Sequence, residues 1–468
     1  MTRGTALKYP VWLVSGTLSM SGLAASLNQT LVIPLLPIFP IELGVSADAA
    51  TWLVTITLLI GAISVPTLSR LADLYGKRPI LLVCLAIMAA GALISALANG
   101  YAALFIGRAL AGFGMALIPI GMSILRDTLP PERVGSAVAL MSATLGFGGA
   151  LGLPLSGLIY DAVGWRWVFG FMFLVPLLLI AAVLIVVRGP NIKAGGRFDF
   201  IGATALSVVI AGVLLVVSRG SIWEWTSFTT IGLSIFSIVV LAAWIPFQLR
   251  TRDPILHLRT MATRTVAFTN IAAVFVGFAL FVSMLLAMQQ LQAPLGTGYG
   301  LGLSVTEAGL WMVPSGLAMV VLSPLNGYLL NRVGGKAVLI AGTVIIALGY
   351  VARNIFYHTP LEVSFAAALV SIGTAFAYAA MPTLIMSAVP LEQTASANGL
   401  NTVLRQVGTS VSSAAVAAVV SITYVLVDGG SYPTWNGIVI LNIVAAVAAL
   451  VGGAAALAIP RSQIVPVH

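Results

Sequence analysis

Arg108 is the residue whose chemistry is hardest to reconcile with its surroundings, because it lies inside the long apolar segment 102–125. A charge at the centre of a membrane helix costs about 2.5–3.5 kcal/mol, and such residues normally face a protein interior or a water-filled cavity. Gly112 and Gly114 follow within two turns and allow close contact on one helix face. We therefore interpret Arg108 as a cavity residue. The alternative is a side chain that extends to the nearby membrane interface.

The acidic residues are few, and none of them lies in the middle of an apolar segment. The sequence contains 13. A carboxylate that relays protons needs a pKa raised toward neutrality by burial. Glu307, Asp73 and Asp127 are the candidates for this role, because each lies near the end of an apolar segment. For Glu307 the alternative is an ordinary acid at a helix N-terminus, where it complements the helix dipole.

The segment 69–78 places charges and a glycine between two apolar segments. Asp73 ends the first segment, Gly76 permits a tight turn, and Lys77 and Arg78 follow. The carboxylate could pair with a basic group or a helix N-terminus elsewhere in the protein and so latch a gate. The alternative is an ordinary charged turn.

The same pattern recurs in the segment 327–336. Asn331 stands where the acid stood, Gly334 follows it, and Arg332 supplies a basic group. This recurrence favours the gating interpretation for both segments. It also predicts two like-oriented halves, related by an axis along the membrane normal.

Two apolar segments carry polar residues on one face, at successive steps of three or four residues. The faces consist of Asn398, Thr402, Arg405, Thr409 and Ser412 in one segment, and of Ser15, Ser19, Gly22, Ser26 and Gln29 in the other. For Ser and Thr alone, hydrogen bonds between helices are the better interpretation. Arg405, which is followed by Gln406, favours a water-filled central cavity.

The segment 134–158 has small residues at every fourth position, namely Gly148, Gly152 and Ser156. Such a row lets a second helix backbone approach closely. Pro154 adds a bend. We expect this helix to seal or rock a bundle and to carry no chemistry.

The elements that position these residues must be membrane helices. The 468 residues are 60% hydrophobic and 7% charged, whereas a soluble domain carries about 25% charged residues. Only helices or closed barrels can cross hydrocarbon, and the long apolar runs do not alternate with period two. We count fourteen spans, at roughly 11–33, 50–70, 79–99, 102–125, 134–158, 167–187, 200–218, 227–248, 266–291, 306–328, 337–356, 362–388, 398–424 and 436–459.

The basic residues predict the orientation of these spans. With both termini in the cytoplasm, only Arg166 and Arg219 of the 22 Lys and Arg residues fall in outside loops. A single miscounted span would invert every later loop, so this asymmetry supports an even count. The net charge of +9 then reflects positive loops, and we expect no nucleic-acid partner. We interpret the run from Val11 as the first span, because it is too long for a signal peptide and no cleavage site follows.

The organisation is therefore six plus two plus six helices. We assign residues 1–190 to an N-terminal six-helix bundle, 191–260 to two additional linker helices, and 261–468 to a C-terminal six-helix bundle.

Several of these segments resemble the sequence motifs of the major facilitator superfamily. The segment 69–78 is similar to its cytosolic loop signature, and 104–114 resembles its membrane-arginine motif. The segment 148–157 resembles its antiporter motif, in which Gly157 joins the small residues described above. The resemblance implies the major facilitator fold.

Further segments resemble the fourteen-helix drug–proton antiporters of that superfamily. They are 165–169, Leu291-Gln292, 308–314 and 404–408. One departure matters, because Leu27-Asn28-Gln29-Thr30 stands where this branch has Leu-Asp-x-Thr. With the polar faces, this resemblance gives the candidates for a central cavity, which are Asn28, Gln29, Arg108, Gln292, Arg405 and Gln406.

The resemblance implies a secondary active transporter that exports small amphiphilic compounds by alternating access, coupled to protons. A lipid or lipid-linked metabolite flippase on the same fold is the alternative. We expect no enzyme, because three scattered histidines and no midplane carboxylate offer neither a metal site nor a catalytic pair. We expect no cofactor, a monomer, and a place in a plasma membrane, that of a bacterium.

Overall fold

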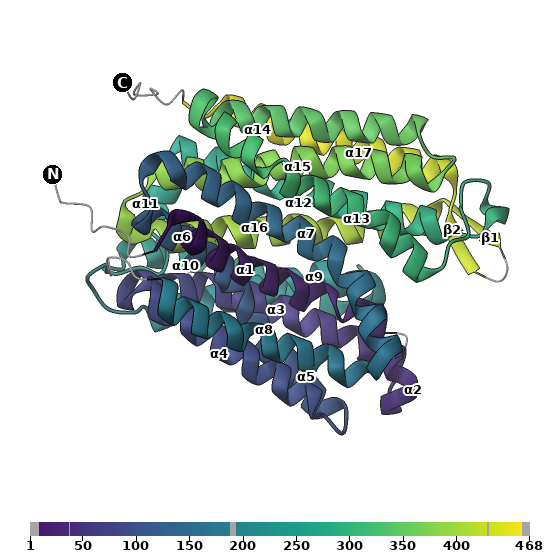
Figure 1. The fold of residues 1–468 in the computed structure, drawn as a ribbon, viewed down its shortest axis with the longest axis horizontal. Coiled ribbons are helices and arrows are strands. Elements are labelled where there is room, and N and C mark those ends of the chain that lie inside the picture. The colour runs from purple at the N-terminus through teal and green to yellow at the C-terminus, as the bar shows by residue number, and fades with distance from the viewer. Residues whose placement is uncertain (1–8, 37, 188–192, 428–429, 461–468) are drawn as a thin grey trace.

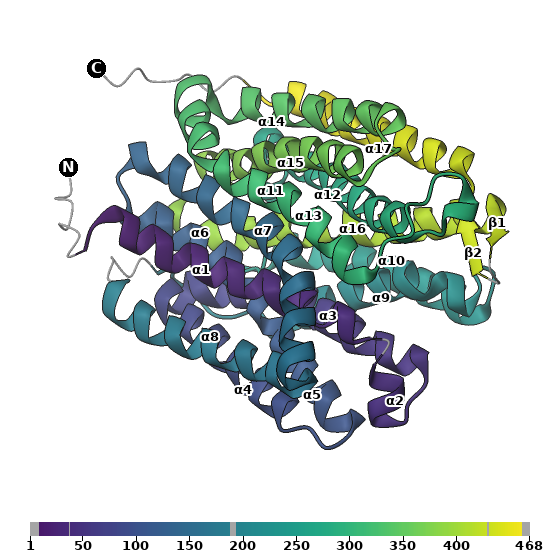
Figure 2. The ribbon, with the colours of Figure 1, turned by 45° about the vertical axis from the view of Figure 1, so that its right-hand side comes forward.

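The chain folds into long helices that run side by side between the two ends of the molecule (Figure 1). This computed structural model describes residues 9–36, 38–187, 193–427 and 430–460. The described chain starts and finishes at the same end of the bundle, and a small β-hairpin lies at the opposite end (Figure 1; Figure 2). The predicted cytoplasmic termini and the predicted domain boundary at residue 190 lie outside the described residues.

Most helices begin and end close to the predicted spans; the exceptions are the spans 306–328 and 337–356, because the observed helices there are 305–321 and 323–355. The helices are α1 (Val11–Thr30), α2 (Phe39–Leu43), α3 (Ala47–Tyr75), α4 (Lys77–Ala96), α5 (Tyr101–Ala111), α6 (Leu117–Thr128), α7 (Pro131–Val163), α8 (Trp165–Val186), α9 (Phe200–Trp223), α10 (Phe228–Arg250), α11 (Leu258–Met261), α12 (Arg264–Gln292), α13 (Val305–Val321), α14 (Ser323–Ile355), α15 (Pro360–Ala388), α16 (Thr394–Ile422) and α17 (Trp435–Leu457). Short 3₁₀ turns are η1 (Ile33–Leu35), η2 (Gly112–Ala116), η3 (Leu295–Thr297) and η4 (Leu391–Gln393).

Twelve helices in the described part of the chain are long and apolar enough to cross a membrane. The predicted fourteen spans are not supported by this count. The difference arises at two places. The helix α1 is not among the twelve, and the stretch Thr306–Ile355, in which two spans were predicted, counts as one.

We call the segments 69–78 and 327–336 the two signature loops. In each of them a glycine with positive φ stands where the preceding helix ends. Gly76 separates α3 from α4 with a φ of 111°, and Gly334 interrupts α14 with a φ of 83°. Residues with a Cβ rarely adopt such angles, so a glycine is suited to the sharp turn at each of these two positions.

Each half contains the same kind of helix crossing, at which glycines let two helix backbones approach closely. In the first half α4 crosses α5, and a Cβ on Gly91 would lie 2.6 Å from the carbonyl oxygen of Gly107. In the second half α14 crosses α15, and a Cβ on Gly342 would lie 2.6 Å from the carbonyl oxygen of Gly373. The internal repeat that was predicted from the loops therefore also appears in the packing.

The helices α9 and α10 form a hairpin that packs beside the first half. Apolar residues of the hairpin, including Leu206, Ile210 and Trp244, belong to the same core as the first six helices. Arg219 of α9 forms an ion pair with Asp48 at the start of α3, and it also donates a hydrogen bond to Thr51. The other flank of α9 contacts α16 of the second half.

The β-hairpin between α16 and α17 was not predicted. Its strands, β1 (Tyr424–Val427) and β2 (Gly430–Pro433), are antiparallel, with Tyr424 opposite Pro433. The apolar residues of β1 continue the hydrophobic run of α16, so their composition alone does not mark the end of the helix.

We expect Gly91→Ala and Gly342→Ala to destabilise the protein by about 1–3 kcal/mol each, since the added methyl group would overlap a backbone carbonyl. The measurement is thermal unfolding of the purified protein in detergent, followed by tryptophan fluorescence. Gly16→Ala in α1 is the control, because a Cβ there meets no atom within 4 Å. Equal melting temperatures for all three variants would contradict the close crossing.

Candidate functional site

Asp73 connects the two halves at the end of the molecule where the described chain starts and finishes. Its side chain is fully buried at the end of α3. The carboxylate accepts hydrogen bonds from the backbone N–H groups of Ala395 and Ser396, at 3.1 and 2.9 Å. These groups open α16, so the negative charge caps a helix N-terminus and complements its dipole.

Basic residues of the first half extend this contact. Lys77 forms a 2.5 Å ion pair with Asp127 and donates a second hydrogen bond to the carbonyl of Leu391 in the second half. Arg126 donates to the Thr394 hydroxyl at 2.6 Å and to the Val389 carbonyl at 3.1 Å. The turn between α15 and α16 is therefore bound by α3, α4 and α6 together. We call this set of contacts the inner seal.

The second signature loop makes a different contact. The amide Nδ2 of Asn331 donates to the carbonyl of Glu132 at 2.9 Å, and Gly135 allows the two helices to approach. The helix α7 begins at Pro131, directly after Pro130. Prolines have no N–H to offer an acid, so an amide donor suits this position. Arg332 bonds to Tyr328 within its own helix.

Arg78 of the first loop does not reach the second half. Its guanidinium donates to the carbonyl of Leu184 at 2.8 Å, which lies in α8 of the same bundle. Of the predicted gating residues, Asp73, Lys77 and Asn331 therefore make contacts across the two halves.

Arg108 and Asn28 bond to each other inside the first half. The Nη1 atom of Arg108 donates to Asn28 Oδ1 at 3.1 Å, and its Nε atom donates to the Leu53 carbonyl at 3.3 Å. Asn28 Nδ2 in turn donates to the Ala111 carbonyl at 2.9 Å. Arg108 Nη2 is buried without a hydrogen-bond partner. The asparagine thus serves as a neutral partner for a charged group.

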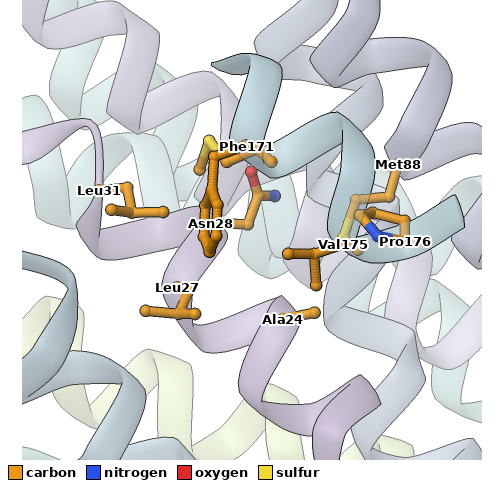
Figure 3. Close-up of a pocket in the computed structure, with 9 residues that line it drawn as sticks. Ala24, Leu27, Asn28, Leu31, Met88, Phe171, Val175 and Pro176 are labelled. Carbon is orange, nitrogen blue, oxygen red and sulfur yellow. The ribbon is translucent and has the colours of Figure 1, made fainter. Parts of the chain in front are cut away.

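A small pocket lies beside this pair, between α1, α4 and α8. It holds about 260 Å³ of empty space. Figure 3 shows Asn28 and Leu27 on α1, with Phe171 and Val175 of α8 and Met88 of α4 around them. The pocket belongs to one bundle and does not lie between the halves.

Arg405 lies in α16 against an aromatic ring. Its guanidinium carbon is 4.5 Å from the centroid of Tyr378, and its Nη2 atom donates to Thr402 at 3.1 Å. The Nη1 atom is buried without a partner. The carbonyl of Tyr378 accepts a hydrogen bond from Ser142 of α7 at 3.1 Å, so this site adjoins the contact between the halves.

The remaining polar candidates are three glutamines and Glu307. Gln29 and Gln406 are half-buried, and Gln292 is the last residue of α12. Glu307 accepts hydrogen bonds from the backbone and hydroxyl of Ser304 and forms a capping box at the start of α13. That geometry corresponds to the alternative considered for Glu307, and its role in proton coupling stays a prediction.

The row of small residues in α7 packs against α1 of its own bundle. A Cβ on Gly148 would meet Ser26, and one on Gly152 would meet Thr30. The Ser156 hydroxyl donates to the Leu31 carbonyl at 2.6 Å. These contacts seal the first half internally, while a Cβ on Gly157 would meet no atom within 4 Å.

Another face of α7 meets the second half. A Cβ on Gly146 would overlap Met319, and a Cβ on Gly316 would lie 2.4 Å from Ala150. Pro154 lies close to Gly309 of α13. This second row was not identified from the sequence, because several faces of α7 carry small residues.

A cavity lies behind the α7–α13 contact, and the sequence candidates do not include any of its residues. It holds about 600 Å³ of empty space and is lined by α7, α12, α13 and α15. Four methionines contribute to its wall, namely Met284, Met288, Met312 and Met319, so we call it the methionine cavity. Methionine and leucine side chains carry no motif that sequence reasoning could have used.

Four buried arginines of the described helices take part in no ion pair, namely Arg70, Arg108, Arg353 and Arg405. They are at most 6% exposed. The ion pairs of the described residues are Lys77–Asp127, Arg219–Asp48 and His358–Glu362. The searched part of the chain also contains no group of histidine, cysteine and acidic residues that could hold a metal ion.

The sequence profile of the Major Facilitator Superfamily matches residues 18–252, 198–413 and 266–467. The chain is 26% identical to the uncharacterised MFS-type transporter YcnB of Bacillus subtilis, over 94% of this chain and 93% of that protein. It is 27% identical to the multidrug resistance protein Stp of Mycobacterium tuberculosis, over 84% and 73%. It is 25% identical to the tetracenomycin C resistance and export protein of Streptomyces glaucescens, over 90% and 78%.

Two solved structures share the fold. The human organic anion transporter MFSD10 (TETRAN) superimposes with a TM-score of 0.65, at 14% identity, over 96% of this chain and 100% of that one. The proton:xylose symporter XylE, bound to 6-bromo-6-deoxy-D-glucose, superimposes with a TM-score of 0.63, at 15% identity, over 96% and 95%.

We expect Asp73→Asn to loosen the inner seal, because an amide nitrogen would replace one acceptor oxygen opposite two N–H donors. Hydrogen–deuterium exchange should show several-fold faster exchange in peptides covering 391–400. Arg78→Gln is the control, since its contact lies within the first half. Exchange that is unchanged in both variants would mean that the cap contributes nothing to the seal.

Proposed function

The chain belongs to the major facilitator superfamily of transporters, and from this membership we propose that it exports small amphiphilic compounds by alternating access, in exchange for protons. The observation that carries the proposal is the pairing of a sealed inner end with a cavity between the same two halves. Alternating access requires a conformation in which the two halves are closed at one end and leave a cavity between them further along. The relatives that are named for multidrug resistance and export support outward transport as the direction.

We further propose that the chain has fourteen spans and belongs to the fourteen-helix drug–proton antiporter branch. The stretch Thr306–Ile355 has 50 residues. At 1.5 Å per residue it would be about 75 Å long, more than twice the roughly 30 Å hydrocarbon core. The non-helical Gly334 supports two spans there. The 20-residue α1, which packs on α7, supplies the remaining one.

The proposed organisation is 1–190, 191–260 and 261–468, with both termini in the cytoplasm of a bacterial cell and a monomer as the working unit. The guanidinium carbon of Arg219 lies 4.4 Å from the ring centroid of Trp52, which adds to its ion pair with Asp48. The N–H of Ala194 also donates to the Asp73 carbonyl at 2.7 Å. These contacts support a hairpin that moves with the first half.

In this proposal the inner seal is the cytoplasmic gate. Opening the gate must separate Asp73 from the start of α16, and Lys77 and Arg126 from the turn before it. Separating these groups from their partners costs free energy, and this cost is offset when water enters and solvates the separated groups. The gate biases a conformational equilibrium and does not touch the substrate.

The charge of the buried groups favours neutral, zwitterionic or anionic amphiphiles. Arg108 and Arg405 lie within helices without carboxylate partners, and Asn28 stands where the branch has an acid. A lipophilic dication would be left unpaired in a region of low dielectric, which is costly. Proton coupling would use Asp73 and Asp127 of the inner seal, or Glu307.

A lipid flippase on the same fold would need an open lateral seam for the lipid tails. The seam between α7 and α13 is instead filled, with Met319 at Gly146 and Gly316 against Ala150. This close packing favours export of smaller compounds.

The orientation predicts different cysteine accessibility at two loops. In a Cys84→Ala background, we expect an impermeant maleimide on intact cells to label Thr226→Cys, between α9 and α10. It should label Gly195→Cys, before α9, only after permeabilisation. Both positions are exposed, and a Cβ at residue 195 meets no atom within 4 Å. Labelling of residue 195 from outside would invert the topology.

Transport into proteoliposomes of a chemically diverse panel, with and without an imposed pH gradient, tests the proposed activity. We expect uptake of neutral and anionic amphiphiles, acceleration by the gradient, and no transport of quaternary ammonium dications. Glu307→Gln, Asp73→Asn and Asp127→Asn are then compared, and at least one should flatten the pH dependence. Efficient dication transport, or proton-driven transport with three unchanged pH profiles, would refute the charge argument.

A further inference from the structure

The methionine cavity has the position expected of a site that changes with conformation. One wall comes from α7 of the first half, and the others come from α12, α13 and α15 of the second. Binding sites are frequent at such interfaces between domains. When the halves rock against each other, the distance between these walls must change.

The apolar wall suits a lipophilic body of variable shape. Met284 and Met288 come from α12, and Met312 and Met319 come from α13. Methionine is unbranched and polarisable, so a methionine wall can adapt to different apolar groups. A water-sized sphere can enter about 90 Å³ of the cavity, several times the roughly 10–15 Å³ that one water needs, so the cavity can hold a small organic group.

The cavity wall contains the serines Ser315, Ser371 and Ser283, and the last of these contacts a charged side chain. The Ser283 hydroxyl accepts a hydrogen bond of 3.3 Å from Arg353 Nη1, and the Ser283 carbonyl accepts another of 3.0 Å from the same atom. The carbonyl four residues earlier, at Ala279, already accepts the hydroxyl of Tyr350. The Ser283 hydroxyl also lies within hydrogen-bonding reach of the Tyr350 hydroxyl, and because a hydroxyl rotates, its proton can turn from Tyr350 to a molecule in the cavity.

Arg353 places a positive charge beside this hydroxyl. The side chain is completely buried, and its Nε and Nη2 atoms have no hydrogen-bond partner. None of the ion pairs in the described part of the chain involves it. A buried cation that lacks a counter-ion favours an electron-rich group nearby.

We propose that the methionine cavity is the substrate subsite of the transporter, and that Ser283, polarised by Arg353, binds an anionic oxygen of an aromatic or aliphatic carboxylate whose apolar body lies against the methionines. The inference rests on the proposed transport function and adds the location and the charge preference of its site.

Equilibrium binding of tritiated 2-naphthoate to the purified protein in nanodiscs tests the proposal. The competitors are 2-naphthylmethanol, which is neutral, and 2-naphthylmethylammonium, which is a cation of the same shape. We expect the order carboxylate, alcohol, ammonium for the wild-type protein. Equal affinities for all three would overturn the charge preference.

Gly149→Leu tests the location, because a Cβ at this cavity-lining position meets no atom within 4 Å and a leucine can fill the space. We expect naphthoate binding to be lost. Gly157→Leu is the matched control, since it is the same substitution on the same helix, also without a contact within 4 Å but outside the cavity lining. Unchanged binding in Gly149→Leu, or equal loss in both variants, would overturn the location.

Ser283→Ala tests the polar contact. We expect naphthoate to bind about tenfold more weakly and the alcohol to change much less. Ser315→Ala is the control, because that hydroxyl lines the same cavity but is bonded to the Met312 carbonyl. Equal effects on both ligands would overturn the role of Ser283.

Efflux from cells, measured for the same variants, separates this inference from the proposed function. If the wild-type protein exports compounds and Gly149→Leu exports them equally well, the subsite is wrong and the function stands. If the wild-type protein binds naphthoate with the expected variant pattern but no compound is exported, the proposed function fails and the subsite stands.

Discussion

Hydrocarbon cannot hydrogen-bond, and every polar group inside this bundle therefore has to find its partner within the protein. Many serine and threonine hydroxyls bond to helix carbonyls, as Ser156 does with Leu31, whereas those of Ser15, Ser19, Ser69 and Thr128 are buried without a partner. Charged groups comply less completely, since Arg108, Arg353 and Arg405 each keep at least one nitrogen without a partner. The inner seal lies at the end of the helices, where water can replace its contacts when it opens. Hydrocarbon thus keeps the contacts of the helix interiors fixed, while water allows the contacts at the helix ends to change.

The sequence predicted the positions of the helices well, because hydrophobic runs and charged loops are local signals. It did not predict which neighbour each helix face would meet. The row at Gly148 and Gly152 was recognised as a packing surface, yet its partner is α1, and another face of α7 meets α13. The methionine cavity was missed for a related reason, since only tertiary structure brings its walls together. Arg353 falls inside the predicted span 337–356, but its bond to Ser283 joins residues 70 positions apart.

The internal repeat is strict in its backbone packing and relaxed in its charges. Both halves place a glycine pair at the same crossing, because two helix backbones can approach that closely only without a Cβ. The signature loops differ, since Asp73 meets two N–H donors and Asn331 meets a carbonyl beside Pro130 and Pro131. Each loop thus carries the group that its opposite helix end can satisfy. Steric constraints have been kept in both copies, while the electrostatics has been adapted locally.

The hairpin α9–α10 has a consequence for how such a chain could have grown. A pair of antiparallel helices returns the chain to the end from which it left, so α12 starts on the same side as it would without the pair. A single inserted helix would invert the whole second half and place Asn331 at the opposite end from Asp73. Insertion in pairs is thus the only kind of addition at this point that preserves the matched loops. The ion pair of Arg219 with Asp48 connects this hairpin to the first half.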